Sequence, residues 1–332
     1  MYLLELAGTE DPLAVREAAS AATAVEHLAP GLATARGVTE RVRTLALTHR
    51  ASDLLGRTDP RAESARALLA ATGVDRAGTV AVRARDVRGL TGVDTQRVER
   101  ELGSELVDRG FAVDLDDPDH ELRAVFSEGV CALGWLAAES VRDFGARRPT
   151  DRPFFQPGSM APLLARVLAN VAGARPGATV LDPMCGTGGI LLEAALVGAD
   201  VLGLDAQARM VRGTRENLGH ALERSHPALP APGAFAVARG DATRLPVADG
   251  AVDGVVFDAP YGRQSKVAGA DRESLVAGAL AAARRVAPRA VVVGDRRWEA
   301  AARDAGWTVA GRYEHPVHRS LTRHVHVLDR DA

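Results

Sequence analysis

The residues with the clearest chemical potential lie in the segment Val255-Val-Phe-Asp-Ala-Pro-Tyr-Gly262, where an apolar strand runs into an acid, a proline and an aromatic residue. The lone pair of an exocyclic amine on a nucleobase is delocalised into the ring, so two acceptors must hold its N–H bonds before that pair can face an electrophile. The carboxylate of Asp258 and the backbone carbonyl of Ala259 can be those acceptors, and Tyr261 offers a stacking face for a flipped base. Pro260 keeps Ala259 extended, which keeps its carbonyl aimed. The segment predicts a site for a planar amine, although Asp-x-Pro-Tyr alone also occurs in plain turns.

A second motif, Val180-Leu-Asp-Pro-Met-Cys-Gly-Thr-Gly-Gly-Ile-Leu-Leu-Glu-Ala194, is typical of a strand that ends in a Gly-rich turn and opens a helix. Such a turn lets a ligand approach the backbone beside the helix N-terminus, which favours a nucleotide-like ligand. Asp205, at the end of the next strand, can accept hydrogen bonds from ribose hydroxyls, and Asp241, in the third strand region, can accept from an adenine amine. A single such Asp is often only a helix cap or turn residue. Three successive strand-end acids, Asp182, Asp205 and Asp241, favour a binding site.

The second half of the chain alternates strands and helices in a way that predicts a parallel, doubly wound α/β sheet. Strands are expected at 178–182, 200–205, near Phe235, at 254–258 and at 290–294, with a first helix from about Ala161. The last two strands, Trp307–Tyr313 and Leu321–Leu328, are joined by a loop too short for a crossover helix. They should therefore form an antiparallel hairpin.

The first half predicts an α+β region, an antiparallel sheet with helices on one face. Strands are expected at 2–6, 79–83, 111–115 and 121–125. One helix should open with Asp11 as its N-cap and Pro12 at its first position, and another should span Asp94 to Arg109.

Between the halves, the segment Arg142–Gly158 is rich in Pro, Arg and Phe and reads as a linker. The predicted division is 1–144, a linker at 145–160, and 161–332. Basic and aromatic side chains of this segment can grip phosphates and stack on bases: Arg142, Arg147, Arg148, Arg152, Phe154 and Phe155. The alternative is a solvated hinge whose Phe residues pack on a domain.

Composition sets wider limits. The 332 residues, 46% hydrophobic and 25% charged, are enough for two globular domains. A net charge of -2 does not point to nucleic acid by itself, although local Arg clusters can still bind phosphate. Cys131 and Cys185 lie far apart, which fits a reducing cytoplasm and no disulfide framework. No signal sequence, membrane span or obligate protein partner is indicated, and the spacing of His315, His318, His324 and His326 predicts no metal site.

The Asp-Pro-Met-Cys-Gly-Thr-Gly-Gly loop, Asp205, Asp241 and Asp258-Ala-Pro-Tyr-Gly together resemble the amino-methyltransferase branch of the class I S-adenosylmethionine enzymes. Arg152-Pro-Phe-Phe-Gln-Pro-Gly-Ser-Met160 and the region before it are similar to the archaeal tRNA guanosine-10 N2-methyltransferases. The resemblance implies a class I Rossmann-like methyltransferase domain, an RNA-binding THUMP domain within 1–144, tRNA as substrate, and one or two methyl groups added to guanine N2. It also implies a set of S-adenosylmethionine contacts: Asp182, Cys185, Gly186, Gly188, Asp205, Asp241 and Ala242.

One departure is Ala259, where the family usually has a second proline, a difference in loop rigidity of about 0.4–1 kcal/mol. Three other functions stay open from the sequence. The first is an amino-methyltransferase that acts on another tRNA guanosine, on rRNA or on DNA. The second is a dinucleotide-dependent oxidoreductase, because the glycines with Asp205 also fit a Rossmann fingerprint. The third is a non-catalytic RNA-binding protein, against which the intact Asp258 argues.

Overall fold

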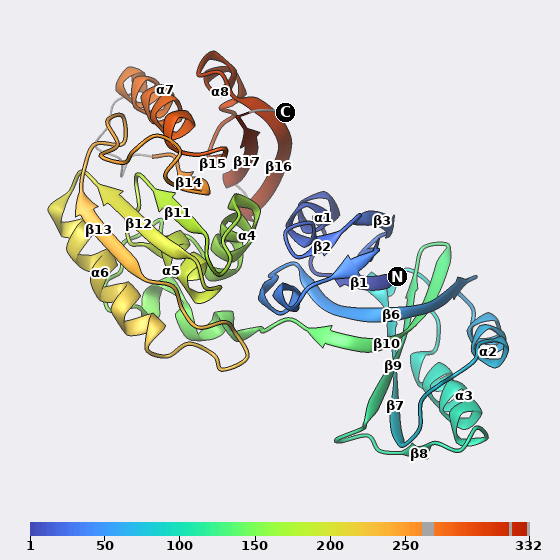
Figure 1. Ribbon diagram of the computed structural model, residues 1–332. Helices are drawn as coiled ribbons and strands as arrows, with labels where there is room; N and C mark the ends of the chain where they lie inside the picture. The colour runs from blue at the N-terminus through green and yellow to red at the C-terminus, as the bar shows by residue number, and fades with distance from the viewer. Residues whose placement is uncertain (261–268, 319–320, 331–332) are drawn as a thin grey trace. The chain divides into compact units, whose positions relative to one another are not determined.

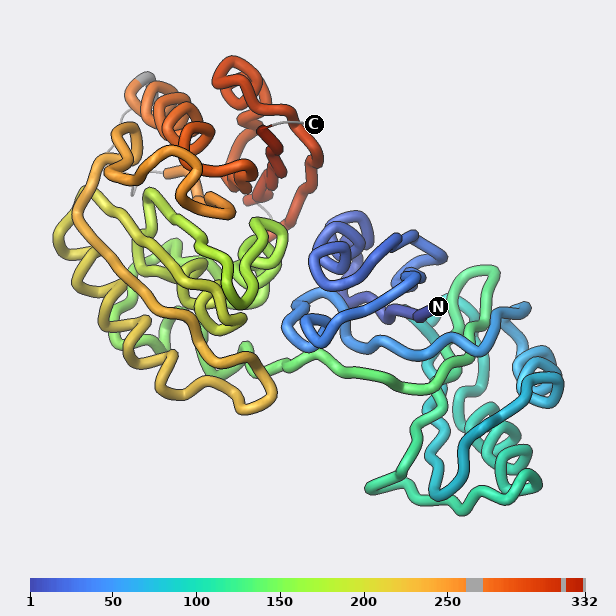
Figure 2. Tube along the Cα trace, viewed as in Figure 1, coloured from blue at the N-terminus to red at the C-terminus, as the bar shows by residue number. Residues whose placement is uncertain are grey.

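A computed structural model describes residues 1–260, 269–318 and 321–330. The chain forms two compact units, Met1–Ser140 and Val141–Ala332, which can be followed by colour in Figure 2. The boundary lies at Ser140, whereas the sequence placed it at 144. Residues 145–160, expected as a linker, belong to the second unit.

The first unit is built on an eight-stranded sheet in the order β3-β4-β1-β6-β10-β9-β7-β8. Its strands are β1 (Tyr2–Leu6), β3 (Glu26–Ala29), β4 (Leu32–Ala35), β6 (Thr48–Thr58), β7 (Thr79–Asp86), β8 (Ala112–Val113), β9 (His120–Ser127) and β10 (Val130–Glu139); β2 (Ala22–Thr23) and β5 (Gly37–Val38) pair separately. The predicted α+β class is confirmed. The expectation of a purely antiparallel sheet is wrong at one edge, because β7 pairs in parallel with both β8 and β9.

Three α-helices belong to this unit, α1 (Asp11–Ala18), α2 (Ala62–Ala71) and α3 (Thr95–Val107), with short 3-10 turns η1 (Glu40–Thr44) and η2 (Val87–Gly89). The α3 helix begins as the sequence predicts, because the Asp94 side chain accepts from the Arg97 amide at 3.0 Å. The predicted N-cap of α1 is wrong. Glu10 occupies that position, and Asp11 turns inward, where it accepts from the Gly31 amide at 2.9 Å and pairs with Arg88.

The second unit has a seven-stranded sheet in the order β13-β12-β11-β14-β15-β17-β16 (Figure 1). Its strands are β11 (Thr179–Asp182), β12 (Asp200–Asp205), β13 (Phe235–Arg239), β14 (Gly254–Asp258), β15 (Arg289–Gly294), β16 (Thr308–His318) and β17 (Leu321–Asp329). Its helices are η3 (Asp143–Arg147), η4 (Pro149–Asp151), α4 (Pro162–Ala172), α5 (Gly189–Leu196), α6 (Ala208–Leu222), α7 (Gly269–Val286) and α8 (Glu299–Asp304).

Strands β11 to β15 pair in parallel, and β17 inserts antiparallel between β15 and β16. Both the doubly wound sheet and the terminal hairpin are therefore confirmed. Parallel strands buried on both faces read as apolar runs, and Val255, Val256 and Phe257 of β14 are all fully buried. Because β13, β12, β11 and β14 are neighbours, the acids that follow these strands lie along one edge of the sheet.

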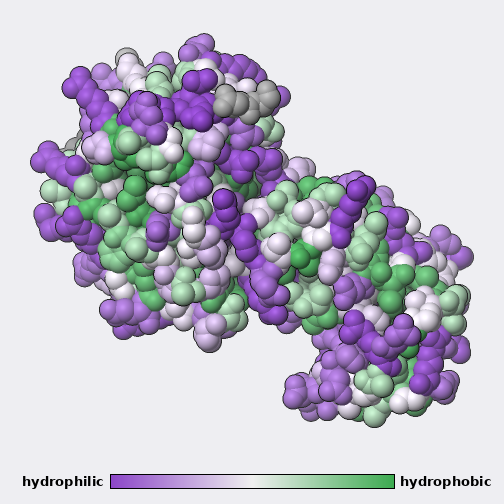
Figure 3. Space-filling model, viewed as in Figure 1, coloured by the Kyte–Doolittle hydropathy of each residue, from purple (hydrophilic) through white to green (hydrophobic). Residues whose placement is uncertain are grey.

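Hydrophilic side chains cover much of the visible face of each unit, with apolar residues between them (Figure 3). Among the described residues, no helix has the length and hydropathy required to cross a bilayer.

Candidate active site

The Gly-rich loop between β11 and α5 forms the centre of the site. Gly186 and Gly188 have φ angles of 53° and 77°, in the left-handed region that favours glycine. A Cβ on Gly188 would also lie 2.6 Å from Cγ2 of Thr214 in α6, so a side chain does not fit there. A Cβ on Gly186 would meet no atom of a described residue within 4 Å, so this stretch of backbone borders space that those residues leave open.

Asp205 braces this loop from the end of β12. Its Oδ2 accepts from the Gly186 amide at 3.0 Å and its Oδ1 accepts from the Gln207 amide at 2.8 Å. Burial raises the pKa of this carboxyl. Asp205 thus holds the turn, and its position next to the Gly-rich loop is also compatible with contact to a ligand bound there.

Asp241 lies farther along the same edge, beyond β13. It is exposed, and its Oδ1 accepts from the amide and the hydroxyl of Thr243 at 2.9 and 2.8 Å, which lowers its pKa. Ala242 beside it is buried in the core of the unit. Their contacts with adenine stay predictions.

A cavity of about 200 Å³ lies at the ends of β11 and β14. It brings together three predicted site residues of the Gly-rich motif, Asp182, Cys185 and Gly186, with Asp258. Asp182 is 3% exposed, and burial raises the pKa of its carboxyl well above the usual range, with further upward contributions from Asp205 and Asp258. A cluster of acids that repel one another favours a cationic ligand.

Asp258 ends β14 and forms part of the cavity wall. Its Oδ2 accepts from Nη1 of Arg323 at 2.5 Å, and its Oδ1 is buried without a hydrogen-bond partner among the described residues. Burial raises the pKa of this carboxyl to about 6, against the lowering effect of Arg323. Arg323 comes from β17 and had no signal in the sequence, since 65 residues separate it from Asp258.

The residues after Asp258 continue the motif. Ala259 is 1% exposed, and its amide donates to the carbonyl of Val293 in β15 at 2.7 Å. A proline at this position could not make that bond. The hydrogen bond therefore anchors the loop in place of the second proline that the family usually carries. Pro260 follows, and Tyr261 lies outside the described residues.

Another part of the cavity lining comes from the segment that was expected to be a linker. Its lining residues are Gln156, Pro157, Gly158, Ser159 and Met160. The segment is pinned to α6, because Asn217 accepts from the Phe154 amide and donates to its carbonyl, both at 2.9 Å. The ring of Phe154 packs where α6 has Gly213, since a Cβ there would come within 1.9 Å of the ring.

Two of the predicted RNA-binding arginines are buried rather than displayed. Arg147 is 9% exposed and pairs with Asp143 at 2.6 Å and with Glu193 at 2.9 Å. Arg152 is 8% exposed, and its Nε donates to the Arg147 carbonyl at 3.2 Å. The ion pair of Arg147 with Glu193 ties the start of the second unit to α5. Exposed residues that retain a surface for RNA are Arg142, Arg148 and Phe155.

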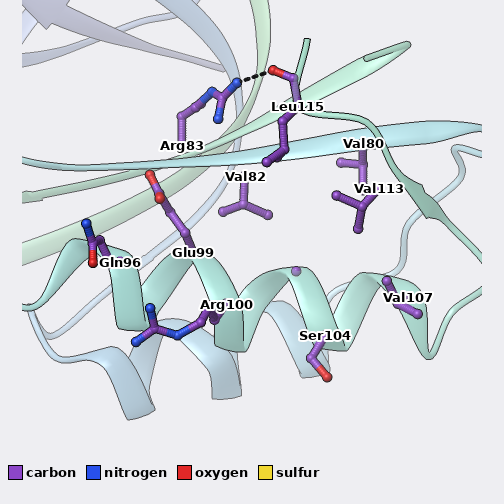
Figure 4. Close-up of a pocket in the computed structure, with 11 residues that line it drawn as sticks. Val80, Val82, Arg83, Gln96, Glu99, Arg100, Ser104, Val107, Val113 and Leu115 are labelled. Carbon is purple, nitrogen blue, oxygen red and sulfur yellow. Dashed lines mark hydrogen bonds between the residues drawn. The ribbon is translucent and has the colours of Figure 1, made fainter. Parts of the chain in front are cut away.

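A second cavity, about 470 Å³, lies in the first unit between α3 and the strands β7 and β8 (Figure 4). Its lining mixes aliphatic side chains, such as Val82 and Val113, with polar and charged ones. Two of its charged residues make hydrogen bonds within the unit, since Arg83 donates to the Leu115 carbonyl and Glu99 accepts from the Ala84 amide. The smaller cavity at Asp258 is therefore the better candidate for chemistry. Among the described residues, no group of three or more His, Cys, Asp or Glu could hold a metal ion.

Comparison with known proteins shows the family to which the chain belongs. Residues 149–324 match the family model of the UPF0020 RMKL-like methyltransferase domain. Over 255 residues the chain is 38% identical to the tRNA (guanine(10)-N2)-dimethyltransferase of Methanothermobacter thermautotrophicus, covering 74% of this chain and 72% of that protein. The chain belongs to this methyltransferase family. Dinucleotide-dependent oxidation is accordingly not the chemistry of the site.

Two further matches place this methyltransferase among its relatives. The tRNA (guanine(6)-N2)-methyltransferase of Thermus thermophilus is 38% identical over 152 residues, covering 44% of this chain and 43% of that protein. The crystal structure of TrmN from Thermus thermophilus superposes with a TM-score of 0.50 at 24% identity, covering 99% of both chains. The structural match supports the class I fold.

Proposed function

We propose that this methyltransferase transfers a methyl group from S-adenosylmethionine to the N2 amine of guanosine 10 in tRNA. The observation that carries the proposal is Asp258, which lines the cavity and whose Oδ1 is a buried acceptor without a partner among the described residues. Buried polar atoms normally have a partner, so such an oxygen points to a donor that arrives with the substrate. The archaeal relative named for guanine-10 N2 supports the choice of base and position.

The residues around the cavity fit S-adenosylmethionine. The open space beside Gly186 admits a ligand close to the backbone, and the N-terminus of α5 begins at Gly189 on the same wall. Asp182 and Asp258 supply negative charge for a ligand with a cationic amine and a cationic sulfur. When bound, the cofactor supplies a methyl group that is activated by its positively charged sulfur. Asp205 and Asp241 are proposed to contact its ribose and adenine.

The chain itself contributes positioning and electrostatics. Oδ1 of Asp258 and the carbonyl of Ala259 accept the two N–H bonds of the target amine, which leaves the nitrogen lone pair free to attack. The nitrogen loses a proton once it carries the methyl group. A carboxyl with a pKa of about 6 is ionised at pH 7 to 8 and can take up that proton.

The first unit is proposed to contain the THUMP domain and to bind tRNA, together with the exposed side chains of Arg142, Arg148 and Phe155. A tRNA substrate implies a cytoplasmic enzyme. Since phosphate contacts dominate such binding, the affinity should fall steeply with salt.

A second candidate is methylation of a different tRNA guanosine, favoured by the similarity to the guanine-6 enzyme. The test is incubation with labelled S-adenosylmethionine and bulk tRNA, followed by nucleotide mapping and mass spectrometry, which also counts the methyl groups. We expect N2-methylated guanosine at position 10. Label confined to position 6, to rRNA or to DNA would replace the proposal with that substrate.

A further inference from the structure

The contact between Asp258 and Arg323 crosses an entire strand. Asp258 lies opposite Val293 of β15, and Val293 lies opposite Val325 of β17. Arg323 is two residues from Val325, so it projects from the same face of the sheet as Asp258. Two strand spacings amount to about 10 Å, a gap that only a long side chain spans. The insertion of β17 beside β15 is what brings the guanidinium to the acid.

This contact divides the two oxygens of Asp258. Oδ2 is held by Nη1 of Arg323, whose side chain is 5% exposed, whereas Oδ1 is buried and has no partner in the described part of the chain. A carboxylate with both oxygens free could accept hydrogen bonds from N1–H and N2–H of guanine at once. Here a guanidinium already occupies Oδ2.

We propose that Arg323 is a positioning residue of the methyl transfer, which fixes the Asp258 carboxylate so that Oδ1 alone receives an N–H of the target amine. The inference rests on the proposed function. The strand β17, which carries none of the sequence motifs, would then orient the Asp258 carboxylate.

The charges around Asp258 make the role measurable. Arg323 faces it from β17, and Asp295, which follows β15, raises its pKa by repulsion. Asp295 in turn pairs with Arg272 of α7 at 3.9 Å, and Asp182 faces the carboxyl from β11. Because Arg323 lowers the pKa of Asp258, its removal should raise that pKa further, by about 1–3 units for a nearby opposite charge.

The experiment compares wild type with Arg323→Gln, Arg323→Lys and the matched control Arg312→Gln, which changes an exposed arginine on β16. Single-turnover tRNA methylation is measured from pH 5 to 9, with cofactor affinity by calorimetry. The Asp258 carboxyl is titrated by carbon-13 NMR, with its signal assigned by its loss in Asp258→Asn.

We expect an acid limb near pH 6 in wild type and in Arg312→Gln. In Arg323→Gln the limb and the NMR titration should move up by about 1–3 pH units, with cofactor affinity near wild type. Arg323→Lys should keep the limb but lose on the order of 10-fold in plateau rate, because an ammonium is a point charge without a planar fork. An unmoved NMR titration in Arg323→Gln would overturn the inference.

Two outcomes remain separable. If wild type does not methylate tRNA, the proposed function fails, while the NMR titration still tests the Arg323 contact. If Arg323→Gln does not fold, the lysine variant decides, and a wild-type rate at every pH in that variant refutes a positioning role.

Discussion

Replacement of Asp258 by Asn is the most direct test of the site. The variant keeps the shape and one acceptor but loses the negative charge. Burial raises the pKa of this carboxyl from the usual 3.8 to about 6, so its ionisation in the site without ligand costs about 3 kcal/mol. A cationic ligand and an N–H donor recover that energy only if the group is charged. We therefore expect a loss on the order of 10²-fold or more in turnover, which corresponds to about 2.7 kcal/mol.

The pH dependence follows with a definite sign. The folded pKa is raised, so the carboxylate is present above about pH 6 and is lost as the pH falls through that value. Wild-type turnover should fall below pH 6, and the Asn variant should be flat there. Single-turnover methylation between pH 5 and 8, with cofactor affinity measured in parallel, checks this against Asp249→Asn, a change at an exposed acid. Near-normal turnover at pH 7.5 would refute the reasoning.

Four further outcomes are expected. Asp205→Ala removes both acceptors that hold the Gly-rich loop and should weaken cofactor binding by about 10-fold or more, and calorimetry showing equal affinity would remove this residue from the site. A fragment that begins at Val141 should bind cofactor but lose most of its tRNA affinity, as measured by filter binding. A fragment that begins near Arg152 lacks the buried ion-pair partners before that residue. It should therefore be less stable than the Val141 fragment by about 3 kcal/mol in urea unfolding. Asp182→Asn should raise the thermal unfolding midpoint more at pH 8 than at pH 5. The pKa of Asp182 is raised in the folded protein, so the stability of the wild type falls as the pH rises, and the Asn variant escapes that loss. An equal increase of the midpoint at both pH values would contradict this prediction. Gly188→Ala should cost more than about 1 kcal/mol in urea unfolding, because both its φ angle and the space oppose a side chain.

The sequence predicted the second unit well because its strands are short apolar runs that end in acids or glycine, as in Gly254–Asp258. The first unit was harder. β6 (Thr48–Thr58) and β10 (Val130–Glu139) were missed, since their pairing contains register shifts that break the alternation of polar and apolar residues. The parallel pairing of β7 was also missed, because it depends on contacts between distant segments.

The sequence predicted the acids and glycines of the candidate site, but not the residues that contact them or complete the cavity lining. Asp182, Cys185, Gly186 and Asp258 do line one cavity. Arg323 could not be found, because its role depends on which strand lies beside β15, and no local pattern encodes that neighbour. The wall from residues 156–160 was likewise hidden, since proline and glycine indicate irregular backbone but not where it packs.

The hydrogen bond from Ala259 to Val293 has a consequence for how the loop can be observed. It leaves a buried amide proton one residue beyond the acid, at a place where a proline would leave none. That proton can exchange with solvent only when the ends of β14 and β15 part. The exchange rate of this amide therefore reports how often the loop after β14 detaches from β15, so hydrogen exchange at Ala259 measures opening of the candidate site.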